Sequence, residues 1–424
     1  MHFINDPRSR VARRHYDGQA LAPSPEYFWL PPVEAVANYR GTLDSMRIGV
    51  TIFCQNYADW DRYEAEERGE AVPDRPATSD RAIFREEVEL AKLADELRFD
   101  SVWTIEHHFT PYTMVTNPLQ LLTYLAGVTT HVDLGTMVIV LPWHNPVRVA
   151  EDIVMLDALL GDRKLIAGVG RGLGRREYGG LGIDQNEARG RFDEAVGIVH
   201  ELLATGRCTF HGEHFDVNDA RLRPQPDGDL SSVLHCAAGT PETMAVIAKR
   251  DIKPLIVPTT NLDLALDGAR RYMQMRVDNG FEPVDTKLAL WIYVAETEAE
   301  ARAGAEKYMV EYGDSALRHY ELLGTHLAGL KGYEGYAARS EVLRKDPTTF
   351  TGVFVAQHPW GTPEMVIEKL SNLAEQFGTS EIMCVFRYGG MGADEAERNM
   401  RLFADKVLPH VRQLHPRPIE LVAR

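Results

Sequence analysis

The stretch LIAGVGRGLGRREYGG, residues 165–180, decides the fold, because an apolar run passes here into glycines at positions 168, 170, 172 and 174. A dinucleotide-binding turn requires the spacing G-x-G-x-x-G in the first βα unit, with a helix directly after it. The third required position is Leu173, and the next long helical pattern begins near residue 185. The stretch therefore indicates a strand end whose missing side chains let a flat or phosphorylated ligand approach the backbone.

Short apolar runs that are typical of buried strands recur along the chain and mostly alternate with helical patterns. They cover residues 46–53, 99–105, 132–142, 164–170, 233–238, 253–257, 287–295 and 381–386. Eight strands separated by helices predict a parallel sheet that closes into a (β/α)8 TIM barrel. Such a barrel needs only about 250 residues, so a chain of 424 residues carries additions. We expect an N-terminal arm at 1–45, then a barrel at 46–424 with a helical insertion at about 297–358.

Charge and cysteine usage exclude several classes of protein. The net charge is −16, so we expect neither a nucleic acid nor an anionic membrane as a partner. No apolar run approaches the length of a membrane span, and the first 45 residues hold no apolar signal-peptide core. The four cysteines, at positions 54, 208, 236 and 384, are far apart and predict free thiols in a reducing cytoplasm.

Titratable side chains follow two of the expected strands at their carboxyl ends, where TIM barrels place their active sites. Arg171 stands among the glycines and offers a bidentate cation. Glu106, His107 and His108 follow the second strand, and strand alternation points His107 away from the other two. Two chemistries fit this triplet, a metal-ligand cluster or a general acid/base with an orienting partner. Because no H-x-H or H-x-x-x-H spacing supplies further ligands, we favour acid/base chemistry and predict no metal.

Four stretches, in matching order and spacing over roughly residues 46–260, resemble the bacterial luciferase family of flavin-dependent monooxygenases. They are EHHF (106–109), LGTMVIVLPWHNPVRVAEDIVMLD (134–157), GDRKLIAGVGRG (161–172) and NEARGRF (186–192). The resemblance implies a TIM barrel that binds FMN at the carboxyl ends of its strands. It assigns no counterpart to the N-terminal arm or to the insertion.

The same resemblance implies roles for individual residues. His107 would be the catalytic histidine near the reactive C4a position of the flavin, and Glu106 would lie close to the flavin and orient the ring or the imidazole. The cofactor-binding residues would be Met137 and Val138, joined by a cis peptide bond under the isoalloxazine ring, with Arg171 at the phosphate end, Leu173, Arg189, Ala238, Gly239 and Thr240. Gly170 replaces the reactive cysteine of luciferase. Ala237 and Ala238 stand where luciferase has acidic and hydroxyl residues, which argues against light emission.

The implied activity is oxygenation of a small organic substrate by reduced FMN and O2, through a C4a-hydroperoxide. Because the chain has no NAD(P) fingerprint, we expect a separate flavin reductase to supply FMNH2 in a two-component system. The insertion at about 297–358 is the candidate lid that keeps water out. By analogy with the family, a homodimer is expected.

Three other functions remain open on the sequence alone. The first is an F420-dependent oxidoreductase on the same barrel, although EHHF favours the monooxygenase. The second is a metal-dependent hydrolase that uses Glu106, His107 and His108. The third is a flavin-binding barrel without catalytic activity.

Overall fold

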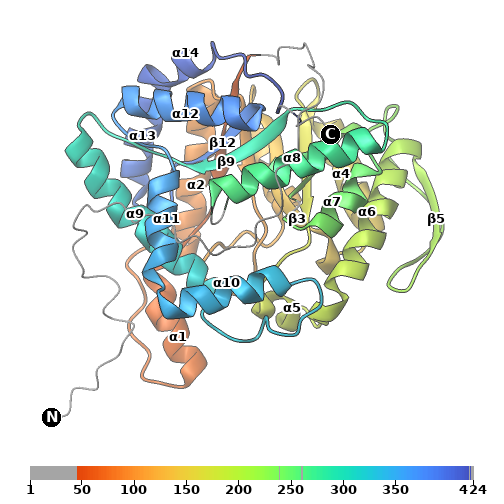
Figure 1. Ribbon diagram of the computed structural model, residues 1–424, viewed down its shortest axis with the longest axis horizontal. Helices are drawn as coiled ribbons and strands as arrows, with labels where there is room; N and C mark the ends of the chain where they lie inside the picture. Colours follow the sequence, from red (N-terminus) through yellow and green to blue (C-terminus); the bar gives the residue numbers. More distant parts are fainter. Residues whose placement is uncertain (1–44, 238, 259–260, 420, 422–424) are drawn as a thin grey trace.

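The computed structural model describes residues 45–237, 239–258, 261–419 and 421, and its centre is a closed barrel of parallel strands (Figure 1). The strands are β1 (Arg47–Ile52), β2 (Ser101–Thr104), β3 (Asp133–Val140), β4 (Leu165–Gly170), β7 (Leu234–Ala237), β8 (Lys253–Ile256), β9 (Thr286–Trp291) and β12 (Thr379–Val385). Around the barrel their order is β1-β12-β9-β8-β7-β4-β3-β2. All eight expected strands are present, so the (β/α)8 TIM barrel is confirmed. The expected N-terminal arm, apart from Ser45, lies outside the described residues.

Helices surround this barrel. They are α1 (Trp60–Arg68), α2 (Asp80–Glu96), α3 (Pro118–Val128), α4 (Pro146–Leu160), α5 (Arg175–Gly180), α6 (Ala188–Thr205), α7 (Pro241–Ala248), α8 (Leu262–Asp278), α12 (Pro363–Phe377), α13 (Ala393–Lys406) and α14 (Leu408–Val411). A small antiparallel hairpin, β5 (Arg207–His211) with β6 (Asp216–Arg221), follows α6. None of the helices in the described part of the chain is both long and apolar enough to cross a membrane.

Helix α4 begins at Pro146, as its sequence predicts. The side chain of Asn145 accepts hydrogen bonds from the backbone N–H groups of Val147 and Arg148, and Pro146 occupies the first helical position. Helix α5 was not expected, because its sequence RREYGG contains two glycines and has low helix propensity. This short helix starts one residue after Gly174 and carries a residue of the candidate site.

The insertion is helical, as expected, and it leaves the barrel at a different point from the one predicted. Strand β9 ends at Trp291 instead of running on to residue 295. The next residues form β10 (Tyr293–Val294), which pairs outside the barrel with β11 (Trp360–Gly361). Between these two short strands lie α9 (Glu298–His319), α10 (Glu334–Lys345) and α11 (Thr348–Gln357), with α10 low in the view of Figure 1.

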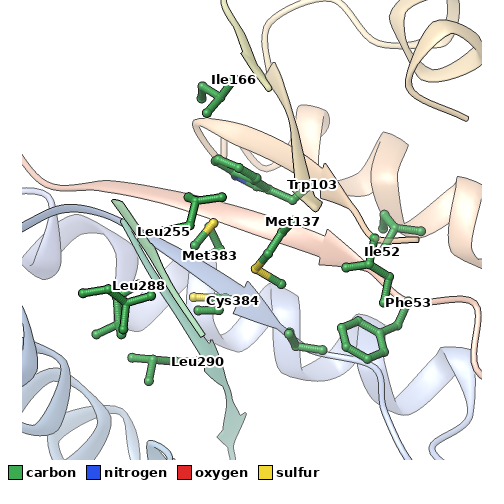
Figure 2. Packing of buried hydrophobic residues seen from close by; sticks show 14 of the residues in the cluster. Ile52, Phe53, Trp103, Met137, Ile166, Leu255, Leu288, Leu290, Met383 and Cys384 are labelled. Atoms are coloured by element: carbon green, nitrogen blue, oxygen red, sulfur yellow. The ribbon is translucent and has the colours of Figure 1, made fainter. Parts of the chain in front are cut away.

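Side chains fill the interior of the barrel. Trp103, Met137, Leu255 and Met383 are buried and point between the strands (Figure 2). A Cβ atom at Gly135 would lie 2.4 Å from the ring of Trp103, so the indole occupies the space that a side chain on the neighbouring strand would need. The barrel is therefore a packed core, and a ligand can enter only at one of its ends.

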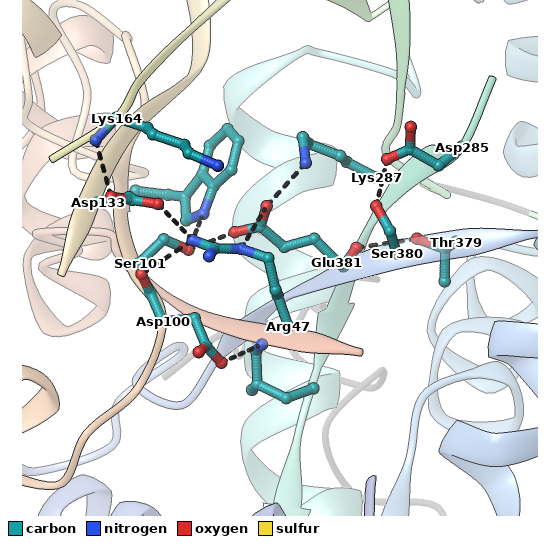
Figure 3. A network of polar contacts seen from close by, with 12 residues as sticks. Arg47, Asp100, Ser101, Asp133, Lys164, Asp285, Lys287, Thr379, Ser380 and Glu381 are labelled. Carbon is teal, nitrogen blue, oxygen red and sulfur yellow. Dashed lines mark hydrogen bonds and ion pairs between the residues drawn. The ribbon is translucent and has the colours of Figure 1, made fainter. Parts of the chain in front are cut away.

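A polar network closes the end at which the strands begin (Figure 3). Its centre is the buried carboxylate of Glu381, which lies 2.7 Å from Lys287 Nζ and 3.8 Å from Arg47 Nε and accepts a hydrogen bond from Ser101. Burial alone would raise the pKa of Glu381, but Lys287 and Arg47 outweigh it and the pKa is lowered. These residues form the floor of the barrel, the end at which its strands begin. A ligand site must therefore lie at the carboxyl ends of the strands.

Candidate active site

A cavity of about 640 Å³ lies at the carboxyl ends of the strands. Its wall contains strand-end residues of the barrel and residues of all three insertion helices: Phe53, Glu106, His107, Met137, Val138, Arg171, Leu173, Gly239, Thr240, Trp291, Tyr312, Tyr336, Arg339 and Phe354 are among them. Cavities of roughly 300–1,000 Å³ are typical of cofactor and small-molecule sites. The size and position of the cavity therefore fit a bound cofactor.

Most of the residues predicted from the sequence meet in this cavity. Glu106, His107, Met137, Val138, Arg171, Leu173, Gly239 and Thr240 all line it. Arg189 reaches the same place, because its Nη2 donates to Thr240 Oγ1 at 3.2 Å. The Met137–Val138 peptide bond is cis, as the resemblance led us to expect. Ala238 lies outside the described residues.

The glycines at the end of β4 let the backbone pack closely against β3. A Cβ atom at Gly170 would lie 2.6 Å from Val138 Cγ2, and one at Gly172 would lie 2.7 Å from Val140 Cγ1. Gly172 also has a φ of +77°, which favours glycine. These glycines are thus required by the neighbouring strand, and both also line the cavity.

One end of the cavity is cationic. The Arg171 side chain lies with its guanidinium 4.2 Å from the centre of the Tyr333 ring, and its Nη2 donates to the Gly332 carbonyl at 2.8 Å. The Nη1 atoms of Arg171 and Arg189 are buried and have no hydrogen-bond partner among the described residues. Buried donors without partners are costly, and two of them on neighbouring guanidinium groups fit an anion such as a phosphate.

A histidine beside the cavity is held by a carboxylate that the sequence did not reveal. His107 Nδ1 lies 2.9 Å from Glu177 Oε1 on α5, and the same oxygen accepts the backbone N–H of His108 at 2.9 Å. The other oxygen, Oε2, lies 3.5 Å from Nε2 of His319 on α9. Burial alone would raise the pKa of Glu177, but the two imidazoles outweigh it and hold that pKa well below its ordinary value. Glu177 is therefore a charged carboxylate between two imidazoles.

Glu106 faces a different set of partners. It accepts the backbone N–H of Val140 at 2.7 Å and lies 2.6 Å from His144 Nε2 and 3.3 Å from His108 Nε2. Burial alone would raise the pKa of Glu106, but the hydrogen bonds from His108 and His144 lower it, and the pKa of His144 is raised in return despite burial. Glu106 thus ties the end of β2 to the end of β3, and the partner of His107 is Glu177 instead.

The three ligands that a metal-dependent hydrolase would need do not converge on one point. His107 points away from Glu106 and His108, as strand alternation predicted. A different group has the geometry of a metal site: ligand atoms of His107, Glu177 and His319 all lie within 4.8 Å of one another. The same arrangement is explained without a metal, because His107 Nδ1 donates to Glu177 Oε1, while Nε2 of His319 lies 3.5 Å from Oε2 and makes no hydrogen bond to it. With a metal or without one, this group places the chemistry at His107.

The end of the cavity opposite Arg171 is aromatic. Strand order places β12 across the barrel from β4, with β1 and β9 on either side of β12. Trp291 ends β9 and packs against Tyr312 of α9 and Phe354 of α11, with ring centres 4.7 Å and 5.1 Å away. Phe53, which follows β1 and is labelled in Figure 2, packs edge-on against Trp291. This wall is built largely by the insertion, so the sequence of the barrel alone gave no sign of it.

Comparison with known proteins shows that this chain is similar to members of one family. The profile described as luciferase-like monooxygenase matches residues 35–381. The alkanal monooxygenase alpha chain of Photorhabdus luminescens is 25% identical over 344 residues, which cover 80% of this chain and 95% of that one. Limonene 1,2-monooxygenase of Rhodococcus erythropolis is 28% identical over 333 residues, 77% of this chain and 81% of the relative. The crystal structure of monooxygenase RslO1 from Streptomyces bottropensis has a TM-score of 0.64 and 26% identity over 86% of this chain and 99% of that one.

Two more distant structures share the fold alone. The oxygenating constituent of 3,6-diketocamphane monooxygenase from Pseudomonas putida, solved with FMN, has a TM-score of 0.62 at 18% identity and covers 86% of this chain and 98% of that one. An F420-dependent secondary alcohol dehydrogenase has a TM-score of 0.61 at 14% identity and covers 87% of this chain and all of that one (100%).

Proposed function

This chain belongs to the luciferase-like monooxygenase family, and we propose that it is the oxygenase component of a two-component, FMN-dependent monooxygenase. The observation that carries the proposal is the cavity with unlike ends: unpaired guanidinium donors at one end, an imidazole held by a carboxylate beside it, and an aromatic wall at the other. Reduced FMN, when bound, would supply the electrons that activate O2. The phosphate would be held by Arg171 and Arg189, and the ring would lie against Met137 and Val138.

His107 is the proposed catalytic residue, and its protonation follows from its partners. Because a charged carboxylate only accepts hydrogen bonds, the contact of His107 Nδ1 with Glu177 places a proton on Nδ1. The other ring nitrogen, Nε2, lies 3.4 Å from the Tyr320 hydroxyl and is left to accept or return a proton during the reaction. Glu177 is then a positioning residue, because it acts through His107.

The substrate side of the cavity is proposed to take a small, largely apolar organic molecule. Tyr112, Tyr312 and Trp291 form its wall, and the Tyr112 and Tyr312 hydroxyls are 2.6 Å apart and bond to each other. Burial raises the pKa of both tyrosines far above neutrality, so the wall carries no charge there. Helices α9 and α11 of the insertion cover this side, which supports their role as a lid that excludes water.

The cofactor and the reductase can be tested together. We expect FMN, and not F420, to quench the intrinsic tryptophan fluorescence of the purified protein. With NADH and FMN alone the protein should do little, whereas adding any flavin reductase should start O2 consumption and give a substrate-dependent product. Binding of F420 without FMN would favour an F420-dependent oxidoreductase, and activity that needs no reductase would contradict the two-component system.

We also propose that this chain forms a homodimer. Large apolar side chains are exposed on α3 and α4, which pack side by side: Tyr124 (56% exposed), Val128 (37%), Met155 (45%) and Leu159 (58%). Contiguous exposed apolar residues on neighbouring helices are typical of protein–protein contacts. We therefore place the contact between two copies of this chain on α3 and α4.

A further inference from the structure

The insertion reaches the cationic end of the cavity as well as the aromatic end. The Gly332 carbonyl accepts a hydrogen bond from Arg171, and the Tyr333 hydroxyl donates to the Gly172 carbonyl at 3.1 Å. A Cβ atom at Gly332 would lie 2.7 Å from Arg171 Nη1 and 3.1 Å from Arg189 Nε, and the φ of Gly332 is +81°. The backbone of the insertion thus lies directly against both guanidinium groups.

Helix α10 begins at this contact and points its first turn into the cavity. Tyr333 precedes the helix and gives no side-chain cap, while Gly335 and Tyr336 of the first turn line the cavity. The start of α7 lies beside this turn, since a Cβ atom at Gly239 would lie 3.4 Å from the Tyr336 hydroxyl. Helix α7 begins at Pro241, and Thr240, which caps it, also lines the cavity. Uncapped N–H groups at a helix N-terminus attract anions.

Arg339 supplies a third cation at this end. It lies on α10, lines the cavity and is only partly exposed. Its guanidinium lies 5.5 Å from the centre of the Tyr336 ring, and it makes no ion pair with any carboxylate in the described part of the chain. An arginine held in a cavity wall without an acidic partner is available to a ligand.

Three carboxylates stand near these cations. Glu334 accepts the backbone N–H of Gly332 at 3.0 Å, and Glu242 lies 3.7 Å from Arg189; both glutamates are exposed and also line the cavity. Asp193 is close enough to Arg189 and Arg171 to interact with both charges, and burial raises its pKa. The Nη1 groups of Arg171 and Arg189 still have no hydrogen-bond partner among the described residues, so they remain available to a ligand.

We propose that the insertion forms the outer half of the phosphate site, in which Arg339 and the first turn of α10 bind the terminal phosphate of the flavin from the side opposite Arg171 and Arg189. The inference rests on the proposed function, since it assigns residues to the same cofactor. It adds contacts to the phosphate and so increases the selection for phosphorylated over unphosphorylated flavin that Arg171 and Arg189 already make. The helix that carries Arg339, α10, is low in the view of Figure 1.

The test compares FMN with riboflavin, which lacks the phosphate, by fluorescence titration of the full chain. Arg339→Ala is expected to weaken FMN binding about tenfold or more, as for loss of a charged hydrogen bond, and to leave riboflavin binding unchanged. Lys345→Ala removes an exposed cation from the last turn of the same helix and is expected to change neither. Arg339→Lys keeps the charge and should recover part of the FMN affinity.

Equal FMN affinity for wild type and Arg339→Ala would overturn the inference and leave the proposed function standing. A parallel loss of FMN and riboflavin binding in both Arg339 variants would also overturn it, because it would assign Arg339 a structural role. A wild-type protein that binds FMN no better than riboflavin would exclude a phosphate site altogether. Failure of the wild type to bind either flavin would instead overturn the proposed function, and this inference with it.

Discussion

Glu177 is the residue on which the candidate chemistry depends, although it lies behind the imidazole and does not line the cavity. It fixes a proton on His107 Nδ1 and also receives the backbone N–H of His108. An amide in its place would offer a donor as well as an acceptor, so the imidazole would no longer be held in one tautomer. The side chain would keep its size.

We predict that Glu177→Gln lowers kcat by about 10²–10⁴, the range of general acid–base catalysis, and leaves KM and FMN affinity within about twofold. Steady-state kinetics with a flavin reductase, together with flavin titration, would measure both. Glu368→Gln, at an exposed position on α12, is the matched control and should behave as wild type. Unchanged kcat in the Glu177 variant would remove His107 and Glu177 from the mechanism.

Without the family resemblance, which supplied Met137, Val138 and Arg189, site residues could be predicted from the sequence where they follow a strand. Glu106, His107 and Arg171 were found because each stands at the end of an apolar run, and barrel topology brings those ends together. Glu177 and His319 were missed because they lie 70 and 212 positions from His107, on helices whose paths no local pattern specifies. Arg339 was missed for the same reason.

At the scale of elements, strands were easier to predict than their ends. Buried parallel strands are short apolar runs, which stand out between amphipathic helices. The run KLALWIYVA, residues 287–295, contains no break in hydrophobicity where β9 ends and β10 leaves the barrel, so one strand was expected where two occur. Pairing of β10 with β11 is a long-range contact that local sequence does not encode.

Helix α2 carries a buried acid that gives the fold a measurable pH dependence. Burial raises the pKa of Glu87 to about 7, against opposing effects of Arg387 and the Phe53 N–H. Between about pH 4.5, its ordinary pKa, and about pH 7 the folded chain holds a proton that the unfolded chain has lost. The free energy of unfolding therefore falls as pH rises through that interval.

The substitution Glu87→Gln should abolish this fall in the free energy of unfolding with rising pH. We expect the variant to be more stable than wild type by about 3 kcal/mol at pH 8 and to differ little at pH 4.5, because one pKa unit corresponds to about 1.4 kcal/mol. Urea unfolding at both pH values measures the difference. Glu96→Gln, exposed at the end of the same helix, should follow the wild type, and a Glu87 variant with the wild-type pH profile would show that the acid is ionised in the fold.

For the whole molecule, the apolar surface of α3 and α4 predicts how copies associate. Leu159, on α4, is 58% exposed. A charge placed in the middle of a contact between subunits loses hydration without gaining a partner. We predict that the wild type sediments as a dimer at micromolar concentration and that Leu159→Glu raises the dissociation constant at least about 100-fold. Val277→Glu, at an exposed apolar position on α8, should remain dimeric, and a monomeric wild type would refute the proposed contact.

The short pairing of β10 with β11 means that the chain leaves and rejoins the barrel at adjacent points. Doubling the length of a loop with adjacent ends costs only about 0.6 kcal/mol in closure entropy. Evolution can therefore lengthen, trim or exchange everything between these two points while the barrel and its polar floor are inherited intact. Descendants of one ancestor can keep the barrel and diverge in the side chains that the insertion brings to the cavity.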